Sequence, residues 1–221
     1  MDHDVEGLVD LARQEIAKQA AHNRFLDLLD AGKVPTERLC RLACELYRLV
    51  GSDRRSFALL AARFSAPPAG DLFLTMAGGE AEALRLLMDF ASALDVGHHD
   101  LAGYEPHPLA QAYPAYLTQT SMYGTSSEAA LALLANVEES GATYARVAAT
   151  LRERYGFSEE AVGHFLFFAD TPQSMKDQAA EVLAAGLSTG DNAADAVRTA
   201  RMVNAYEAIF WSVLADGLDE G

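Results

Sequence analysis

The residue with the clearest chemical potential in this sequence is Glu207, a carboxylate near the end of a predicted C-terminal helix. At about 100° per residue, it lies in the middle of an apolar arc. The members of that arc are Ala200, Val203, Tyr206, Phe210, Trp211, Val213 and Leu214. A carboxylate on a buried face must be paired, hydrogen-bonded or protonated, and its pKa shifts. Glu207 is therefore a candidate general acid/base or ligand-binding group, and the alternative is a structural carboxylate that meets an arginine or a helix end.

Three further carboxylates interrupt apolar faces of predicted helices, namely Asp53, Glu80 and Glu138. Asp53 lies inside the arc of its helix, Glu80 lies at the border of its arc, and Glu138 is aligned with the apolar stripe of a third helix. Several carboxylates inside a helical bundle suggest a metal site or a polar pocket for a cationic or hydrogen-bonding ligand. The alternative is that nearby arginines, such as Arg146, neutralise some of them.

The elements that position these residues are predicted to be helices throughout. Helical spacing and end signals favour helices over about residues 36–64, 71–94, 109–123, 125–155 and from 191 onward, besides shorter pieces. Thr125 and Glu128 fit a capping box, and Gly78-Gly79 marks an interruption or a close approach within its helix. Residues 96–108 are expected to form the longest loop. No period-2 pattern typical of strands occurs, so the prediction is an all-α bundle of about seven or eight helices.

Composition limits the class of protein. The 221 residues are 50% hydrophobic, which favours one domain over residues 1–221 with a sizeable core. The formal net charge of −15 comes from 32 acidic and 17 basic residues, and such a surface repels phosphate, so nucleic-acid binding is not expected. No uncharged apolar run reaches the roughly 18 residues of a membrane span, and the acidic N-terminus lacks signal-peptide features. These features predict a cytoplasmic protein without membrane association.

The cysteines and histidines predict neither a redox centre nor a metal centre. Cys40 and Cys44 lie four residues apart, off the apolar stripe of their helix, and are expected to be reduced thiols. His164 stands alone beside an aromatic run and is predicted to be structural. The histidines of the 96–108 loop have no metal-ligand spacing, so no cofactor is expected.

Short motifs along nearly the whole chain resemble TenA-type proteins, the thiaminase II group of the heme-oxygenase-like helical fold. The closing Tyr206-Glu207-x-x-Phe210-Trp211 resembles the end of that family, and Gly32-x-x-Pro35 resembles its turn before the second core helix. Asn23-Arg24-Phe25 stands where the family usually has His-Pro-Phe. The family's middle segment resembles the motifs Ala112-Tyr113-x-x-Tyr116, Gly124 and Ala132-Leu133-Leu134.

The resemblance implies a catalytic role for Glu207 and a pocket role for Tyr113, and it implies a homo-oligomer. The family's nucleophilic cysteine falls at Asn136, and an amide cannot replace the thiolate that thiaminase chemistry requires. Thiaminase activity is therefore not expected. The family's pocket aspartate falls at Leu46, for which Asp53 is a candidate substitute, and two pocket tyrosines fall at Ser140 and Asp170.

The same fold also includes di-iron oxidases, whose ligands are glutamates, histidines and an aspartate. Aligned with them, the carboxylate ligands would be Glu80, Glu138 and Asp170. The positions of the three histidine ligands hold Leu87, Leu166 and Gln173. Carboxylates without imidazoles make a poor iron site, so this remains a lesser alternative.

The leading hypothesis is a TenA-like protein that encloses a planar or amine-bearing small molecule. The expected ligand-binding residues are Tyr113, Tyr116, Asn136, Asp53, Glu138, Phe210 and Trp211. Glu207 would act as general acid/base in a cofactor-independent hydrolase or lyase reaction at a C–N bond. The alternative is a non-catalytic ligand-binding or regulatory protein.

Overall fold

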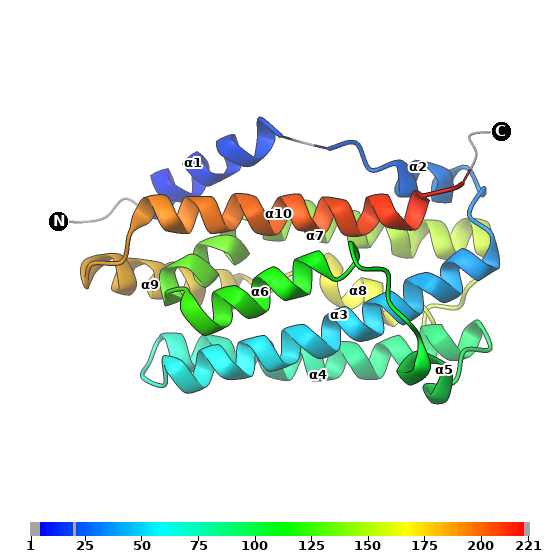
Figure 1. The fold of residues 1–221 in the computed structure, drawn as a ribbon, viewed down its shortest axis with the longest axis horizontal. Helices are drawn as coiled ribbons and strands as arrows, with labels where there is room; N and C mark the ends of the chain where they lie inside the picture. Colours follow the sequence, from blue (N-terminus) through cyan, green and yellow to red (C-terminus); the bar gives the residue numbers. More distant parts are fainter. Residues whose placement is uncertain (1–4, 20, 219–221) are drawn as a thin grey trace.

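The computed structural model shows an all-α fold and describes residues 5–19 and 21–218 (Figure 1). Within these residues there are ten helices and no strand, which confirms the predicted class. The helices are α1 (Val5–Ala17), α2 (Arg24–Asp30), α3 (Thr36–Arg63), α4 (Ala69–Ala93), α5 (His98–Gly103), α6 (Ala112–Tyr123), α7 (Ser126–Tyr155), α8 (Gly163–Ala169), α9 (Gln173–Ser188) and α10 (Ala193–Ala215).

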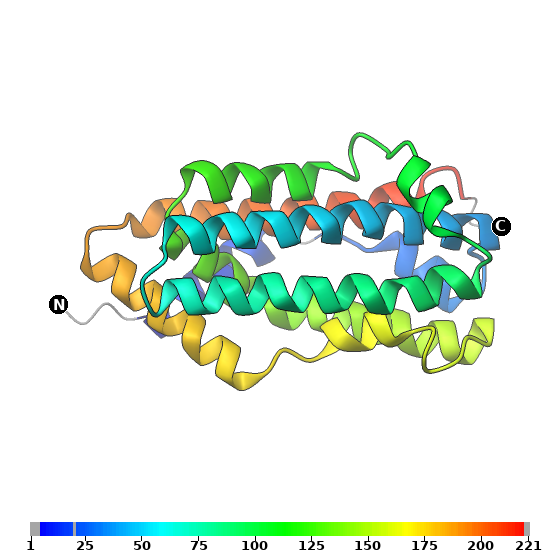
Figure 2. The same cartoon turned by 90° about the horizontal axis from the view of Figure 1, so that it is seen from below.

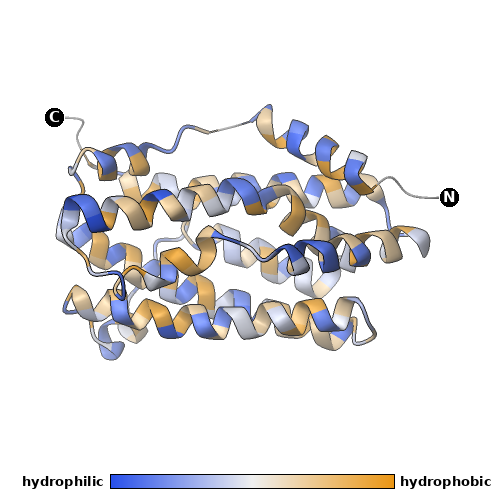
Figure 3. Ribbon diagram, turned by 180° about the vertical axis from the view of Figure 1, so that it is seen from behind, coloured by the Kyte–Doolittle hydropathy of each residue, from blue (hydrophilic) through white to orange (hydrophobic). Residues whose placement is uncertain are grey.

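The long helices α3, α4, α7 and α10 run along the long axis of the molecule (Figures 1 and 2). Helix α3 packs on α4 and α6, whereas α7 packs on α8, α9 and α10. Helices α1 and α2 cover the outer side of α10. Figure 3 shows apolar and polar residues alternating along the helices, as expected where each helix buries one face. The bundle thus encloses an interior to which α3, α4, α6, α7 and α10 all contribute.

Local signals in the sequence explain the ends of the helices that matter for this interior. The predicted capping box of α7 is present, because the Thr125 hydroxyl accepts a hydrogen bond from the Glu128 N–H at 3.2 Å and the Glu128 carboxylate accepts one from the Thr125 N–H at 3.0 Å. Gly156 ends the same helix with a left-handed φ of 74°. The Asn192 side chain caps α10 by accepting hydrogen bonds from Ala194 and Asp195.

Two details of the predicted helix map are wrong, and of the two alternatives given for Gly78-Gly79 the interruption is absent. The described residues hold ten helices rather than seven or eight, partly because the expected 96–108 loop contains α5. That helix has six residues, too few to show a 3.6-residue period, and its first turn is closed by a hydrogen bond of 2.9 Å from the Gly97 N–H to Asp100. Helix α4 runs through Gly78 and Gly79 without interruption, since an isolated glycine pair weakens a long helix but does not end it. Helix α6 begins at Ala112 rather than Leu109.

Cys44 is buried, not off the apolar face as predicted, because α3 is covered by α4, α5 and α6 and so buries a wider arc than one stripe. Both cysteines are free thiols. Burial raises the pKa of the Cys44 thiol to about 11, which keeps it protonated and unreactive at neutral pH. Along the described ranges, no helix is both long enough and apolar enough to cross a membrane.

Candidate functional site

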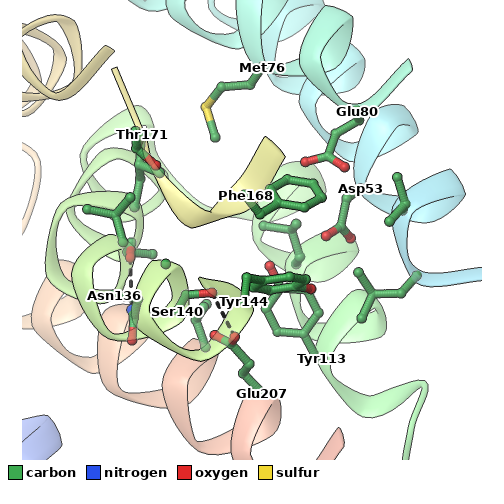
Figure 4. Close-up of a pocket in the computed structure, with 18 of the residues that line it drawn as sticks. Asp53, Met76, Glu80, Tyr113, Asn136, Ser140, Tyr144, Phe168, Thr171 and Glu207 are labelled. Carbon is green, nitrogen blue, oxygen red and sulfur yellow. Dashed lines mark hydrogen bonds between the residues drawn. The ribbon is translucent and has the colours of Figure 1, made fainter. Parts of the chain in front are cut away.

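A cavity of about 160 Å³ lies inside the bundle, between α3, α4, α6, α7 and α10, with the end of α8 as its remaining wall. Figure 4 shows that polar side chains from several of these helices point into it. Its polar and charged lining residues are Asp53, Glu80, Tyr113, Asn136, Ser140, Tyr144, Thr171 and Glu207. This size is ample for several waters or one small ring compound.

Glu207 reaches the cavity from the middle of α10, as its place on the aromatic arc predicted. Ser140 on α7 donates a hydrogen bond of 2.8 Å from its hydroxyl to the Glu207 carboxylate. Burial raises the pKa of Glu207, the nearby Glu139 carboxylate adds to the rise, and hydrogen bonds from Ser140 and Trp211 oppose it. Among the described residues that line the cavity there is no Lys, Arg or His. The structure therefore gives no support to the alternative in which an arginine neutralises Glu207.

Glu207 also borders a second, smaller pocket of about 60 Å³, here called the outer pocket. Its walls come from the segment before α2 and from the outward sides of α7 and α10. It shares Ser140, Glu207 and Trp211 with the cavity. Glu207 therefore lies between the cavity and the outer pocket.

Asp53 and Glu80 lie on another side of the cavity. Burial raises the pKa of Asp53 well above its usual value, the adjacent Glu80 carboxylate raises it further, and a hydrogen bond with Tyr113 opposes the rise. Burial also raises the pKa of Glu80 to about 8. One oxygen of each group, Asp53 Oδ1 and Glu80 Oε2, is buried without a hydrogen-bond partner. Both acids therefore ionise less readily than exposed carboxyl groups do.

Aromatic rings form the walls between these acidic positions. Tyr144 on α7 lies at 5.2 Å from Phe168 and at 5.8 Å from Trp211, measured between ring centroids. Burial raises the pKa of both Tyr113 and Tyr144 well above the usual value, so their hydroxyl groups stay neutral and can donate hydrogen bonds. Flat rings with hydroxyl tips favour a planar ligand with polar edges.

Asn136 occupies the position at which the resemblance places a nucleophilic cysteine. Its amide nitrogen donates hydrogen bonds to the carbonyl oxygens of Ala132 at 2.8 Å and Ala200 at 3.1 Å. Its side-chain oxygen is buried without a partner. Asn136 is therefore held rigidly with a free acceptor at the cavity wall, and it cannot act as a nucleophile. Neither Cys40 nor Cys44 lines the cavity.

The structure brings together seven of the predicted site residues and leaves three outside. Around the cavity lie Glu207, Asp53, Tyr113, Asn136, Phe210 and Trp211, together with Glu80. Tyr116 does not line the cavity, because its ring packs on Tyr206 at a centroid distance of 5.3 Å. The predicted inward orientation of Glu138 is wrong, since its side chain is 64% exposed and lies 3.1 Å from Arg13. Asp170 is exposed as well, so the alternative carboxylate metal site loses two of its three ligands.

The described residues contain no group of three or more His, Cys, Asp or Glu side chains that could hold a metal ion. His164 is buried beside Phe165 and Phe168, and its Nδ1 donates to the Ala83 carbonyl oxygen at 3.0 Å. Burial lowers its pKa to about 4, so it is neutral at physiological pH. These contacts are those of a structural histidine.

The cavity is also lined by Tyr144, Phe168 and Thr171, which no sequence pattern predicted as site residues. Tyr144 follows Asn136 and Ser140 at intervals of four, so helical spacing from Asn136 could have found it. Phe168 and Thr171 flank the end of α8 and carry no comparable signal. They reach the cavity because Gly141 lets that segment approach α7, where an added Cβ would lie 3.0 Å from the Ala169 carbonyl oxygen.

Glu45 is a fully buried carboxylate outside the cavity that no sequence pattern predicted. It accepts hydrogen bonds from the Tyr104 hydroxyl at 2.9 Å, the His107 N–H at 2.8 Å and the Gln111 amide at 3.0 Å. These bonds fasten the connection between α5 and α6 to α3. Glu45 therefore fixes the start of the helix that carries Tyr113 into the cavity.

Fold and site together define an all-α bundle protein with an acid-lined cavity between its helices. The comparison with protein families gives the particular family: the chain belongs to the TENA/THI-4/PQQC family, whose model matches residues 12–165. The predicted TenA resemblance is thereby confirmed. The matched range ends before α9 and α10, so it includes Asp53, Glu80 and Tyr113 but not Glu207.

Solved structures share the fold at low sequence identity. A TenA homolog from Pseudomonas syringae pv. tomato str. DC3000 has a TM-score of 0.71 at 16% identity, over 95% of this chain and 90% of that one. A TenA homologue from Pyrococcus furiosus has a TM-score of 0.64 at 20% identity, over 95% and 98%. A domain of unknown function with a heme oxygenase-like fold from Shewanella denitrificans OS217 has a TM-score of 0.67 at 14% identity, over 95% and 89%. No curated protein matches the sequence. The predicted heme-oxygenase-like fold is confirmed.

Proposed function

We propose that this protein binds a small, flat, amine-bearing molecule in the cavity and that Glu207 acts on it as a general acid/base. The reaction class that fits is hydrolysis or elimination at a C–N bond without a cofactor, since a carboxyl group with a raised pKa can hold and deliver a proton near neutral pH. The single observation that carries the proposal is the place of Glu207. It is hydrogen-bonded to Ser140, borders both the cavity and the outer pocket, and has no cation beside it in the cavity lining.

Thiaminase chemistry is not part of the proposal. Asn136 is fixed by two hydrogen bonds at the position of the nucleophile, and the pKa of the Cys44 thiol is raised to about 11 at a place outside the cavity. A general acid/base needs no such nucleophile. In hydrolysis water attacks the substrate, and in elimination Glu207 takes a proton from it. The expected cytoplasmic location and homo-oligomeric state remain predictions.

The test is the substitution Glu207→Gln, which preserves size and hydrogen-bonding capacity but cannot exchange a proton. Native mass spectrometry of freshly purified protein first identifies a bound compound, and the fluorescence of Trp211, the single Trp of the chain, reports its binding. We expect Glu207→Gln to retain the melting temperature and to lose about 10²–10⁴-fold in turnover. Glu138→Gln, an exposed carboxylate on α7, is the matched control and should behave like the wild type.

If Glu207 is structural instead, the same substitution lowers the melting temperature and leaves binding and turnover per folded molecule unchanged. That result refutes the proposal. Binding without consumption of the ligand supports the second candidate, a non-catalytic regulator. A structure with a TM-score of 0.67 to this chain is described as a TenA family transcription regulator from Silicibacter sp. TM1040, at 14% identity and with 95% of this chain and 96% of that one covered.

A further inference from the structure

The outer pocket lies under the connection between α1 and α2, which passes along the outer side of α10 (Figure 1). It shares Ser140, Glu207 and Trp211 with the cavity. The polar residues that line the outer pocket but not the cavity are His22, Asn23, Glu139, Thr143 and Asn204. Glu207 thus borders two spaces that open on different parts of the bundle.

The two spaces differ in size. The cavity measures about 160 Å³, whereas the outer pocket measures about 60 Å³. A cavity of about 150 Å³ can hold a benzene ring, and one water-sized molecule needs only about 10–15 Å³. The outer pocket therefore excludes a ring compound but admits a small amine. When a C–N bond breaks between a flat ring compound and a small amino group, the two fragments have these two sizes.

The polar lining of the outer pocket favours a cation with N–H donors. Burial raises the pKa of Glu207 and the Glu139 carboxylate raises it further, so the two acids are close enough to interact. The Glu139 carboxylate accepts a hydrogen bond from the Asn204 amide at 3.1 Å. No Lys or Arg occurs among the described residues that line this pocket, and the Nε2 of His22 lies 2.6 Å from Asp27. An ammonium ion between two carboxyl groups supplies positive charge and donors together.

We infer that the outer pocket receives the small amine released at the C–N bond and passes it to solvent beside Glu139, while the ring fragment remains in the cavity. In hydrolysis the oxygen of water bonds to the carbon, the C–N bond breaks, and the Glu207 carboxyl group gives its proton to the leaving nitrogen. A proton of the attacking water restores the carboxyl group, so the products are an alcohol and an amine. In elimination Glu207 moves a proton from carbon to the leaving nitrogen, and a double bond forms. This inference rests on the proposed function, since it assigns a place to one product of that reaction.

The test uses methylammonium as the probe, because it has the charge and the N–H donors of a small amine product. Its binding is followed at constant ionic strength by the fluorescence of Trp211, the single Trp of the chain, which lines the outer pocket. Tetramethylammonium is the matched cation, since it has the same charge but no N–H donor. We expect a saturable change with methylammonium at millimolar concentration, as suits so small a ligand, and none with tetramethylammonium.

Variants distinguish the outer pocket from the cavity. Glu139→Gln removes a charge from the outer pocket and Ala208→Leu fills it, and neither residue lines the cavity. Both should weaken methylammonium binding at least about tenfold. Thr143→Leu fills the same pocket from α7 and replaces Ala208→Leu if that variant does not fold. Glu138→Gln, an exposed carboxylate next to Glu139 that lines neither space, is the matched control.

The outcomes separate the inference from the proposed function. No saturable change with the wild type, an equal response to tetramethylammonium, or unchanged affinity in Glu139→Gln and the filled variants overturns the inference. If Glu207→Gln loses turnover but methylammonium does not bind the wild type, the proposed function stands and the inference is wrong. If methylammonium binds in the outer pocket but Glu207→Gln keeps full turnover, the proposed function is wrong, and with it the assignment of this pocket to a reaction product.

Discussion

The substitution Glu80→Gln should make the ligand-free protein more stable, and increasingly so as the pH rises. Burial raises the pKa of Glu80 from 4.5 to about 8. Below about pH 4.5 the group is protonated in the folded and the unfolded chain, so it has no effect on the free energy of unfolding. Above that pH the unfolded chain loses the proton while the folded chain keeps it, and stability falls until the folded pKa is passed.

The size of the effect follows from the shift. Each pKa unit corresponds to about 1.4 kcal/mol, so the full loss of stability reaches a ceiling of about 5 kcal/mol at pH 8 and above. The effective dielectric constant of protein sites, even buried ones, is higher than that of a dry interior, and we therefore expect a gain of about 2 kcal/mol for Glu80→Gln at pH 7. Removal of Glu80 also lowers the pKa of Asp53, because the Glu80 carboxylate is one cause of its rise.

Urea denaturation at several pH values between 4 and 9 measures this gain as the difference in unfolding free energy between variant and wild type. The difference should be near zero at pH 4 and should open between about pH 4.5 and 8. Glu82→Gln provides a control of opposite sign, since the hydrogen bond with Arg85 lowers the pKa of Glu82 and its stabilisation is present only above the unfolded pKa. A constant difference across this range, or a Glu80→Gln variant less stable than the wild type at pH 8, would refute the placement of Glu80.

Two further predictions concern residues outside the cavity. Alkylation of Cys40 and Cys44 should leave any activity intact, and the protein should not cleave thiamine. Chromatography of the products measures thiamine cleavage. Thiamine hydrolysis that is lost on alkylation would contradict the assignment of Asn136. Glu45→Ala should lower the free energy of unfolding by about 3 kcal/mol in urea titrations, because three half-buried donors lose their buried acceptor. The exposed Glu105→Ala should have little effect. Equal stability of these two variants would contradict the structural role of Glu45.

How far the sequence predicts the site depends on how clearly each helix marks its buried face. In α10 the large residues Val203, Phe210 and Trp211 define one face, and Glu207 was placed correctly on it. In α7 small residues lie on every side, and Ala129, Ala130, Ala132 and Ala135 are all buried. An alanine-rich surface can pack against neighbours in several directions, so the predicted stripe of α7 follows the edge of the buried face rather than its centre: Leu134 and Ala148 are buried, whereas Glu138 is exposed. For this reason Glu138 was predicted to face the interior, and Tyr144 was not predicted to line the cavity.

Contacts between distant segments set a second limit. Glu45 is 59 residues from Tyr104 and 66 from Gln111, and no helical period relates them. The end of α8 reaches the cavity only because it crosses α7 at Gly141. Such placements come from the packing of whole elements, whereas the fold class and the capping box of α7 follow from local spacing and could be predicted.

The contrast between Glu45 and the two cavity carboxylates, Asp53 and Glu80, bears on the role of the cavity. A buried carboxylate costs stability unless donors satisfy it, and the chain supplies donors to Glu45 from three places. For Asp53 and Glu80 it leaves oxygens unpartnered, although both face a space that apolar side chains could fill. A core under selection for stability alone would replace these acids with apolar residues of similar size. Their incomplete hydrogen bonding is consistent with the proposed ligand, which would supply donors to these oxygens.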